Sequence, residues 1–170
     1  RILGKGTPGW PLVQTWFFVY GGNDGEVCTH GTKAHADNAM VNINIWLAPD
    51  SANLGSAQTG DGGGLTVFHA KPPDEWQFED FNGNSTTAET FLREHDAGNT
   101  SVEHRQNRAL IFNSMLFHQS DPFRFKKGFT NRRINLTLLM GSRPAEDSRG
   151  AERERREITP DEAGVLRYCY

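Results

Sequence analysis

Segments with the character of short β-strands recur along the chain, and this pattern limits its possible folds more than any other feature. Pro11–Tyr20 is rich in aromatic and β-branched side chains and is followed by the turn-forming run GGNDG. Val41–Leu47 alternates apolar and polar side chains with a period of two. Further strand-like segments are Leu65–His69, Arg108–Phe112 and Arg133–Met140. The pattern predicts a sandwich, barrel or jelly-roll rather than an alternating β-α-β sheet.

The chain has 170 residues, of which 36% are hydrophobic, and this is enough for the core of one domain. We place that domain at residues 1–141. One helix is expected at Thr86–Glu94, with Thr86 or Thr87 as its cap. Residues 142–170 are expected to form a charged C-terminal tail or surface helix, because residues 141–163 are strongly charged and hold almost no large apolar side chains.

The charge balance does not favour nucleic acid or a membrane as a partner. The formal net charge is −3, so the whole chain does not attract polyanions. No stretch approaches the roughly 18 consecutive apolar residues of a membrane span. We therefore expect a soluble, cytoplasmic protein, although an upstream signal stays open because the chain begins at Arg1. Nothing in the sequence indicates the oligomeric state.

Three side chains form a candidate metal site. His35 and Asp37 lie two residues apart, so an extended backbone directs both side chains to one side. His118 follows the apolar segment ALIFNSMLF and precedes QSDP, which we expect to be a polar loop. Two histidines and one carboxylate suit Fe(II) and leave three positions, enough for a bidentate 2-oxo acid and for O2. The zinc-hydrolase signature HExxH is absent.

The remaining four histidines lack a carboxylate at a comparable spacing. We expect them to be structural or exposed: His30, His69, His95 and His104.

The segment Arg133–Met140 carries polar side chains on one face, namely Arg133, Asn135 and Thr137. A guanidinium inside a barrel is costly unless a carboxylate pairs with it, and a dicarboxylic ligand would supply that carboxylate. Thr137 could donate a second hydrogen bond to the same group. The alternative is an edge strand whose polar face meets water. Arg132 is a second candidate for the carboxylate, although its position in the alternation places it with the apolar residues.

The ordered set His35-x-Asp37, His118 and Arg133-x-x-x-Thr137 resembles that of the 2-oxoglutarate-dependent Fe(II) oxygenases, which include prolyl-hydroxylase-like and nucleic-acid-demethylase branches. The sequence around these residues resembles that of a prolyl-hydroxylase-like, bacterial-type subgroup of this family, which is often found beside tetratricopeptide repeats. The segments are KAHADNAMVNINIWLAPDSANL, GGGLTVFHAKPPDEW, NRALIFNSMLFHQSD and GFTNRRINLTLLMG. The resemblance covers roughly residues 10–141, and no such repeat is visible in this chain.

The resemblance implies an all-β dominated fold, namely a double-stranded β-helix (jelly-roll, cupin-like) with one or two short helices packed outside. It implies that His35, Asp37 and His118 hold Fe(II), and that the co-substrate 2-oxoglutarate chelates the iron and reaches Arg133 with its distal carboxylate. Reaction with O2 would then release succinate and CO2 while an unactivated C–H bond is hydroxylated. Halogenases of this superfamily lack the carboxylate, so Asp37 favours hydroxylation or desaturation.

Other positions carry weaker expectations. Asn135, Asn42, Asn44 and Tyr20 could face the co-substrate, or could equally satisfy polar groups at strand ends. The run Gly62–Gly64 is more typical of a bulge or tight connection than of a phosphate cradle, because no Lys-Ser/Thr pair follows it.

Two alternatives to the oxygenase remain open: a cupin-like metal-binding jelly-roll that does not use 2-oxoglutarate, and a non-catalytic binding module. The primary substrate is not indicated and could be a small molecule, a peptide or a protein side chain. The pocket walls are expected from the first 34 residues and from an insert at Lys71–Glu103. The aromatic residues of this insert are more typical of a small core of its own than of a lid. They are Trp76, Phe78, Phe81 and Phe91.

Overall fold

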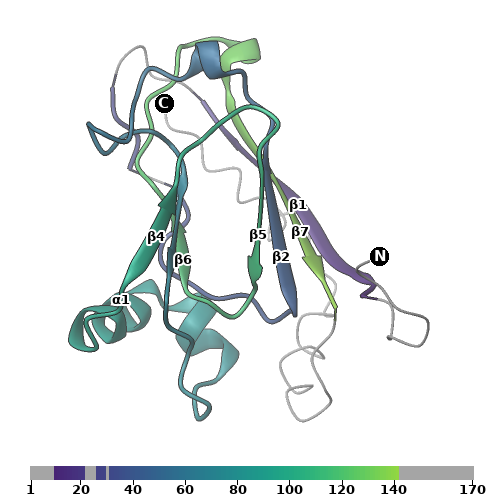
Figure 1. The fold of residues 1–170 in the computed structure, drawn as a ribbon, viewed down its shortest axis with the longest axis vertical. Coiled ribbons are helices and arrows are strands. Elements are labelled where there is room, and N and C mark those ends of the chain that lie inside the picture. The colour runs from purple at the N-terminus through teal and green to yellow at the C-terminus, as the bar shows by residue number, and fades with distance from the viewer. Residues whose placement is uncertain (1–9, 22–25, 30, 142–170) are drawn as a thin grey trace.

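Two antiparallel sheets form the described part of the chain, which comprises residues 10–21, 26–29 and 31–141 of the computed structural model. The sheets lie as two layers (Figure 1). The larger sheet has the order β1 (Leu12–Tyr20), β7 (Arg133–Met140), β2 (Val41–Trp46), β5 (Ala109–Asn113). The smaller has the order β4 (Asn99–Val102), β3 (Leu65–Phe68), β6 (His118–Ser120). The predicted all-β dominated fold is confirmed at this level.

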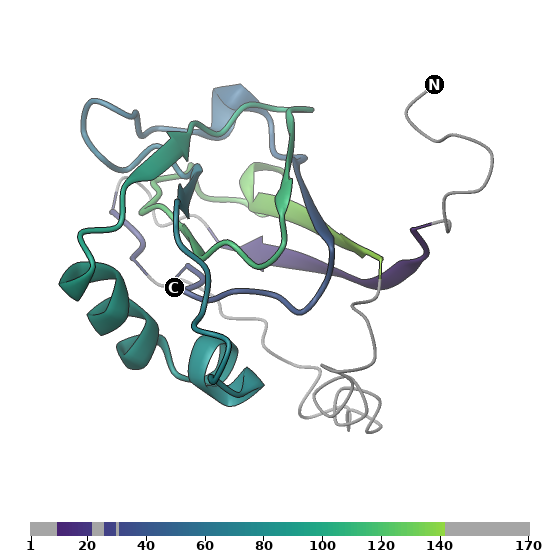
Figure 2. The same ribbon diagram turned by 60° about the horizontal axis from the view of Figure 1, so that its bottom comes forward.

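The helical elements lie beyond one end of the smaller sheet (Figures 1 and 2). They are a π-helical turn at Glu79–Gly83 and the helix α1 at Ser85–Glu94, which matches the predicted helix. The expected cap was wrong, because the side chain of Asn84 accepts the hydrogen bond from the Thr87 amide. Short 3-10 turns occur at Asp50–Ala52 and Phe129–Asn131.

The large sheet has an inverted pattern of burial. Along β7, Arg133, Asn135 and Thr137 are buried, whereas the apolar residues between them are partly exposed. Along β2, Asn42 and Asn44 are likewise buried. Because β7 lies between β1 and β2, the edge-strand alternative for this segment is wrong. Burying polar side chains is costly unless they are hydrogen-bonded, and hydrogen bonds join Asn44 to Asn135 and Thr137 on this face.

β1 lies at an edge of the large sheet and pairs only with β7 among the described strands. Their register joins Trp16 to Thr137 and Tyr20 to Arg133. The first strand of the domain is therefore held by the last one.

Two short strands of the smaller sheet were not predicted. The expected polar loop after His118 is wrong in its first residues, since His118–Ser120 forms β6 and pairs with β3. The polar strand β4 lies within the predicted insert and pairs with the other side of β3. The predicted strand Arg108–Phe112 is shifted by one residue, to Ala109–Asn113.

The aromatic residues of the insert form a packed core, as predicted, but this core is shared with the rest of the domain. Phe81 is buried with Ala88 and Leu92 of α1, and Met115 and Phe117 join them from outside the insert. Trp76, Phe78 and Phe91 pack against this cluster.

The predicted charged tail, residues 142–170, lies outside the described residues. Among those that are described, no helix is long and apolar enough to cross a membrane.

Candidate metal centre

His35 and His118 are brought together by backbone pairing. The His35 amide donates to the His118 carbonyl at 3.1 Å, and the His118 amide donates to the His35 carbonyl at 2.8 Å. Their rings lie 4.3 Å apart between centroids. Two histidines that are 83 positions apart in sequence thus become neighbours because β6 pairs with the segment that carries His35.

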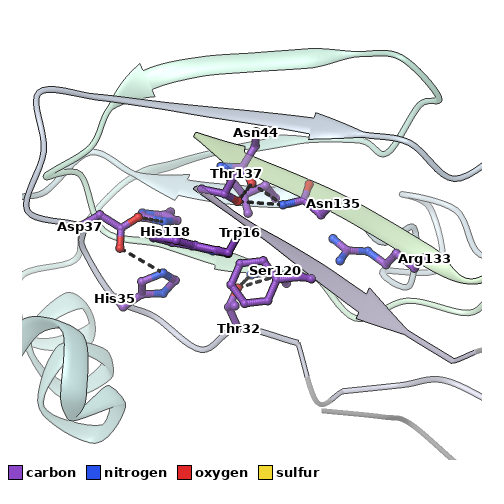
Figure 3. A pocket seen from close by; sticks show the side chains of 12 residues that line it. Trp16, Thr32, His35, Asp37, Asn44, His118, Ser120, Arg133, Asn135 and Thr137 are labelled. Carbon is purple, nitrogen blue, oxygen red and sulfur yellow. Dashed lines mark hydrogen bonds and ion pairs between the residues drawn. The ribbon is translucent and has the colours of Figure 1, made fainter. Parts of the chain in front are cut away.

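Asp37 lies beside the two imidazoles, and its carboxylate faces both of them (Figure 3). Its Oδ1 is 3.8 Å from His35 Nε2, and its Oδ2 is 3.4 Å from His118 Nε2. One ligand atom from each of the three residues lies within 4.8 Å of the others. The structure therefore brings together all three predicted metal ligands, and it shows no second group of this kind within residues 10–21, 26–29 and 31–141.

Backbone carbonyls orient both rings. His35 Nδ1 lies 2.6 Å from the Lys33 carbonyl, and His118 Nδ1 lies 2.9 Å from the Leu116 carbonyl. A carbonyl only accepts hydrogen bonds, so each Nδ1 carries the proton when the ring is neutral. Each Nε2 then keeps its lone pair free for a metal ion, as a metal-binding histidine requires.

The charge states also suit a cation. Burial lowers the pKa of His35, and the neighbouring His118 lowers it further, so the neutral, metal-binding form is favoured. Burial raises the pKa of Asp37, but contacts with His118 and His35 and a hydrogen bond from Asn82 outweigh burial and hold the pKa below its usual value. Two imidazole nitrogens and one carboxylate form a donor set that fits a divalent metal ion such as Fe(II).

A pocket extends from this cluster along the inner face of the large sheet (Figure 3). Its cavity volume is only about 10 Å³, so the side chains of this structure nearly fill it. The predicted residues that line it are His35, Asp37, Asn44, His118, Arg133, Asn135 and Thr137. Trp16, Phe18 and Thr32 line it as well, in agreement with the walls expected from the first 34 residues. The walls expected from Lys71–Glu103 are wrong, because no residue of that insert lines the pocket. Leu65 and Ser120 were not predicted.

Arg133 lies across the pocket from the histidines and is only 1% exposed (Figure 3). Its Nε and Nη2 donate to the Gly63 carbonyl at 3.0 and 2.9 Å, and its guanidinium lies 5.4 Å from the ring centre of Tyr20 and 5.0 Å from that of Phe123. Burial lowers the pKa of Arg133, while Tyr20 and Asp121 raise it. Within the part of the chain that the structure describes, no carboxylate lies within 4 Å of the guanidinium.

The buried amides form a chain of hydrogen bonds from Asp37 toward Arg133. Asn42 Nδ2 donates to Asp37 Oδ2 at 2.8 Å, Asn44 Nδ2 donates to Asn42 Oδ1, and Asn135 Nδ2 donates to Asn44 Oδ1. The Thr137 hydroxyl also donates to Asn44 Oδ1, at 3.0 Å. A hydrogen bond from Thr137 to a bound carboxylate would therefore compete with this contact.

Other predicted residues are placed as follows. Tyr20 is buried with its ring beside Arg133, whereas Arg132 lies over the exposed ring of Phe129. His104 is buried between aromatic rings, His69 and His95 make hydrogen bonds near the surface, and His30 lies outside the described residues.

No protein-family model matches the chain, and no curated protein matches it.

Proposed function

We propose that this chain is the catalytic domain of an Fe(II)- and 2-oxoglutarate-dependent dioxygenase that hydroxylates an unactivated C–H bond. In this proposal the two antiparallel sheets are the two halves of a double-stranded β-helix. The products from the co-substrate are succinate and CO2. Support comes from the His35, Asp37 and His118 cluster and from Arg133, which line one pocket.

The observation that carries the proposal is the buried Arg133 guanidinium, which has no carboxylate within 4 Å among the described residues. Such a charge is costly in a protein interior, and an anionic ligand that makes two hydrogen bonds offsets the cost. A ligand in this pocket would meet the metal cluster at one end and Arg133 at the other. A dicarboxylic 2-oxo acid has the functional groups that these two ends require.

The chain's own residues have separate tasks in this reaction. His35, Asp37 and His118 hold the metal, which when bound supplies the chemistry that activates O2. Arg133 binds the distal carboxylate of 2-oxoglutarate and sets its direction. The pocket also has an apolar wall, which limits the access of water to the ligand. It is formed by Trp16, Phe18 and Leu65.

An anaerobic titration with Fe(II) and 2-oxoglutarate tests the proposal. We expect a weak visible charge-transfer band, because this band requires chelation of ferrous iron by a 2-oxo acid. His118→Ala should abolish the band. Arg133→Ala should raise the dissociation constant for 2-oxoglutarate on the order of 100-fold, as expected for the loss of one partner of a buried charge pair.

Arg132→Ala is the matched control, because Arg132 neighbours Arg133 but contacts only the exposed ring of Phe129 among the aromatic rings described. Its affinity for 2-oxoglutarate should equal that of the wild type. If iron binds and no band forms at any 2-oxoglutarate concentration, the oxygenase is rejected in favour of a cupin-like metal-binding protein. If neither ligand binds, a non-catalytic binding module is the better account.

A further inference from the structure

The helical segment 78–97 lies against the loop that carries two of the metal ligands. We call this segment the helical insert; it contains the π-helical turn and α1. The Ala36 amide donates to the Phe81 carbonyl at 2.9 Å, and Asn82 Nδ2 donates to the Ala36 carbonyl at 2.8 Å. Ala36, which lies between His35 and Asp37 in sequence, is thus bonded to the insert through both its amide and its carbonyl.

The same Asn82 amide reaches the metal-ligating carboxylate. Asn82 Nδ2 lies 3.2 Å from Asp37 Oδ1, while Asn42 Nδ2 lies 2.8 Å from Asp37 Oδ2. An amide group has two hydrogens, so Asn82 can bond the Ala36 carbonyl and Asp37 together. Each oxygen of Asp37 therefore receives one amide hydrogen bond, one from the large sheet and one from the helical insert.

Packing fixes the helical insert in this position. Phe81 and Ala36 belong to one buried apolar cluster, together with Met115 and Phe117, which precede His118 in the chain. Segment 78–97 supplies no member of the candidate metal cluster itself. Its effect on the metal would thus pass through the orientation of Asp37.

We infer that Asn82 is a positioning residue, which links docking of the helical insert to metal affinity at the site of the proposed function. Groups that hold a metal-binding side chain typically change metal affinity by 10- to 100-fold when they are removed. Linkage is reciprocal, so a bound metal must stabilise the docked insert to the same extent.

The test uses Mn(II) alone, as an air-stable divalent probe, with no 2-oxoglutarate and no turnover. Calorimetry should show that Asn82→Ala weakens Mn(II) binding by about 10- to 100-fold. Hydrogen–deuterium exchange in residues 78–97 should slow when Mn(II) binds to the wild type. In Asn82→Ala, Mn(II) at a saturating concentration should slow exchange in this segment much less than it does in the wild type.

Asn84→Ala is the matched control within the same insert. It removes the cap of α1, and so speeds exchange in the first turn of α1, but the Asn84 side chain bonds the Thr87 amide rather than Asp37. Its Mn(II) affinity should stay within about two-fold of the wild type, because the change leaves both hydrogen bonds to Asp37 in place. Asn82→Leu, which keeps the volume and removes the donors, serves as second variant if Asn82→Ala does not fold.

The outcomes separate this inference from the proposed function. The inference alone is overturned if both Asn82 variants bind Mn(II) with the affinity of the wild type. It is also overturned if Mn(II) does not slow hydrogen–deuterium exchange of residues 78–97 in the wild type. Absence of Mn(II) binding in the wild type overturns the metal site and the inference with it. If Mn(II) affinity and exchange in residues 78–97 change together as expected, but 2-oxoglutarate gives no charge-transfer band, the inference is supported and the oxygenase is rejected.

Discussion

Trp16 presents a hydrogen-bond donor that no acceptor among the described residues uses. Its Nε1 is buried, and its side chain lines the pocket between the metal cluster and Arg133 (Figure 3). An indole N–H can only donate, and leaving it unpaired when buried costs about 1–3 kcal/mol. A carboxylate oxygen of a bound ligand is a suitable acceptor.

We therefore expect Trp16→Phe to weaken 2-oxoglutarate binding by about 5- to 30-fold while keeping an aromatic wall. The measurement is the same anaerobic titration that tests the site. Trp10→Phe is the control, because Trp10 is 47% exposed and does not line the pocket. Equal affinities in the two variants would show that the indole N–H does not meet the ligand.

The element that holds Arg133 is the glycine-rich connection before β3. The Gly63 carbonyl accepts from Nε and Nη2 of Arg133, and the Gly64 carbonyl lies 3.4 Å from Nη2. Gly63 has φ of +69°, and a Cβ added there would lie 2.9 Å from Phe123 Cβ and 3.4 Å from Arg133 Nε. The predicted tight connection thus also positions the arginine.

Gly63→Ala should lower both the stability of the fold and the affinity for 2-oxoglutarate. The added methyl group strains the backbone by about 1–3 kcal/mol and displaces the carbonyl that orients Arg133. Urea unfolding measures the stability, and the anaerobic titration measures the affinity.

Gly60→Ala separates the two effects. Gly60 has φ of +72°, but a Cβ added there has no neighbour within 4 Å. This variant should lose about 1 kcal/mol of stability and bind 2-oxoglutarate as the wild type does. If Gly63→Ala also binds normally, the connection does not position Arg133.

Elements with a clear local pattern could be predicted from the sequence, and others could not. The alternation in β2 and β7 is visible within six to eight residues, because side-chain direction in a strand depends on parity alone. β6 and β4 span only three and four residues with mostly polar side chains. Their strand conformation comes from pairing with β3, which the local sequence does not specify.

The same distinction holds for the site. The spacing of His35 and Asp37 is local, and the inverted polarity of β7 indicated an interior arginine. Asn82 and Trp16 gave no such signal, because their roles depend on segments that only the folded chain brings to the pocket.

At the scale of the whole molecule, His104 makes stability depend on pH. It is 5% exposed, and its two ring nitrogens have no hydrogen-bond partner among the described residues. Burial, reinforced by the positive charge of Arg133, lowers its pKa to about 4, although Asp50 at 3.7 Å opposes the shift. The folded state therefore favours the neutral ring.

Because the folded pKa is depressed, the stabilisation is fully present above pH 6.5 and is lost as the pH falls toward 4. We expect a loss of about 2–3 kcal/mol in the wild type that His104→Phe does not show. Urea unfolding of both proteins between pH 7.5 and pH 4 measures the difference, with other acidic groups contributing equally to both. Parallel curves would mean that the pKa of His104 is the same in the folded and the unfolded protein.

The pairing of β1 with β7 sets the order in which the domain can be completed during synthesis. A ribosome releases the aromatic strand β1 first, yet its partner is the last strand of the described domain. Until residue 140 has left the exit tunnel, β1 has no strand to pair with, and β7 has not delivered Arg133 to the pocket. A nascent chain that stops after His118 already contains the three candidate metal ligands but lacks Arg133, the residue proposed to bind the dicarboxylate. If the proposed function holds, 2-oxoglutarate can bind only after translation of the domain is finished.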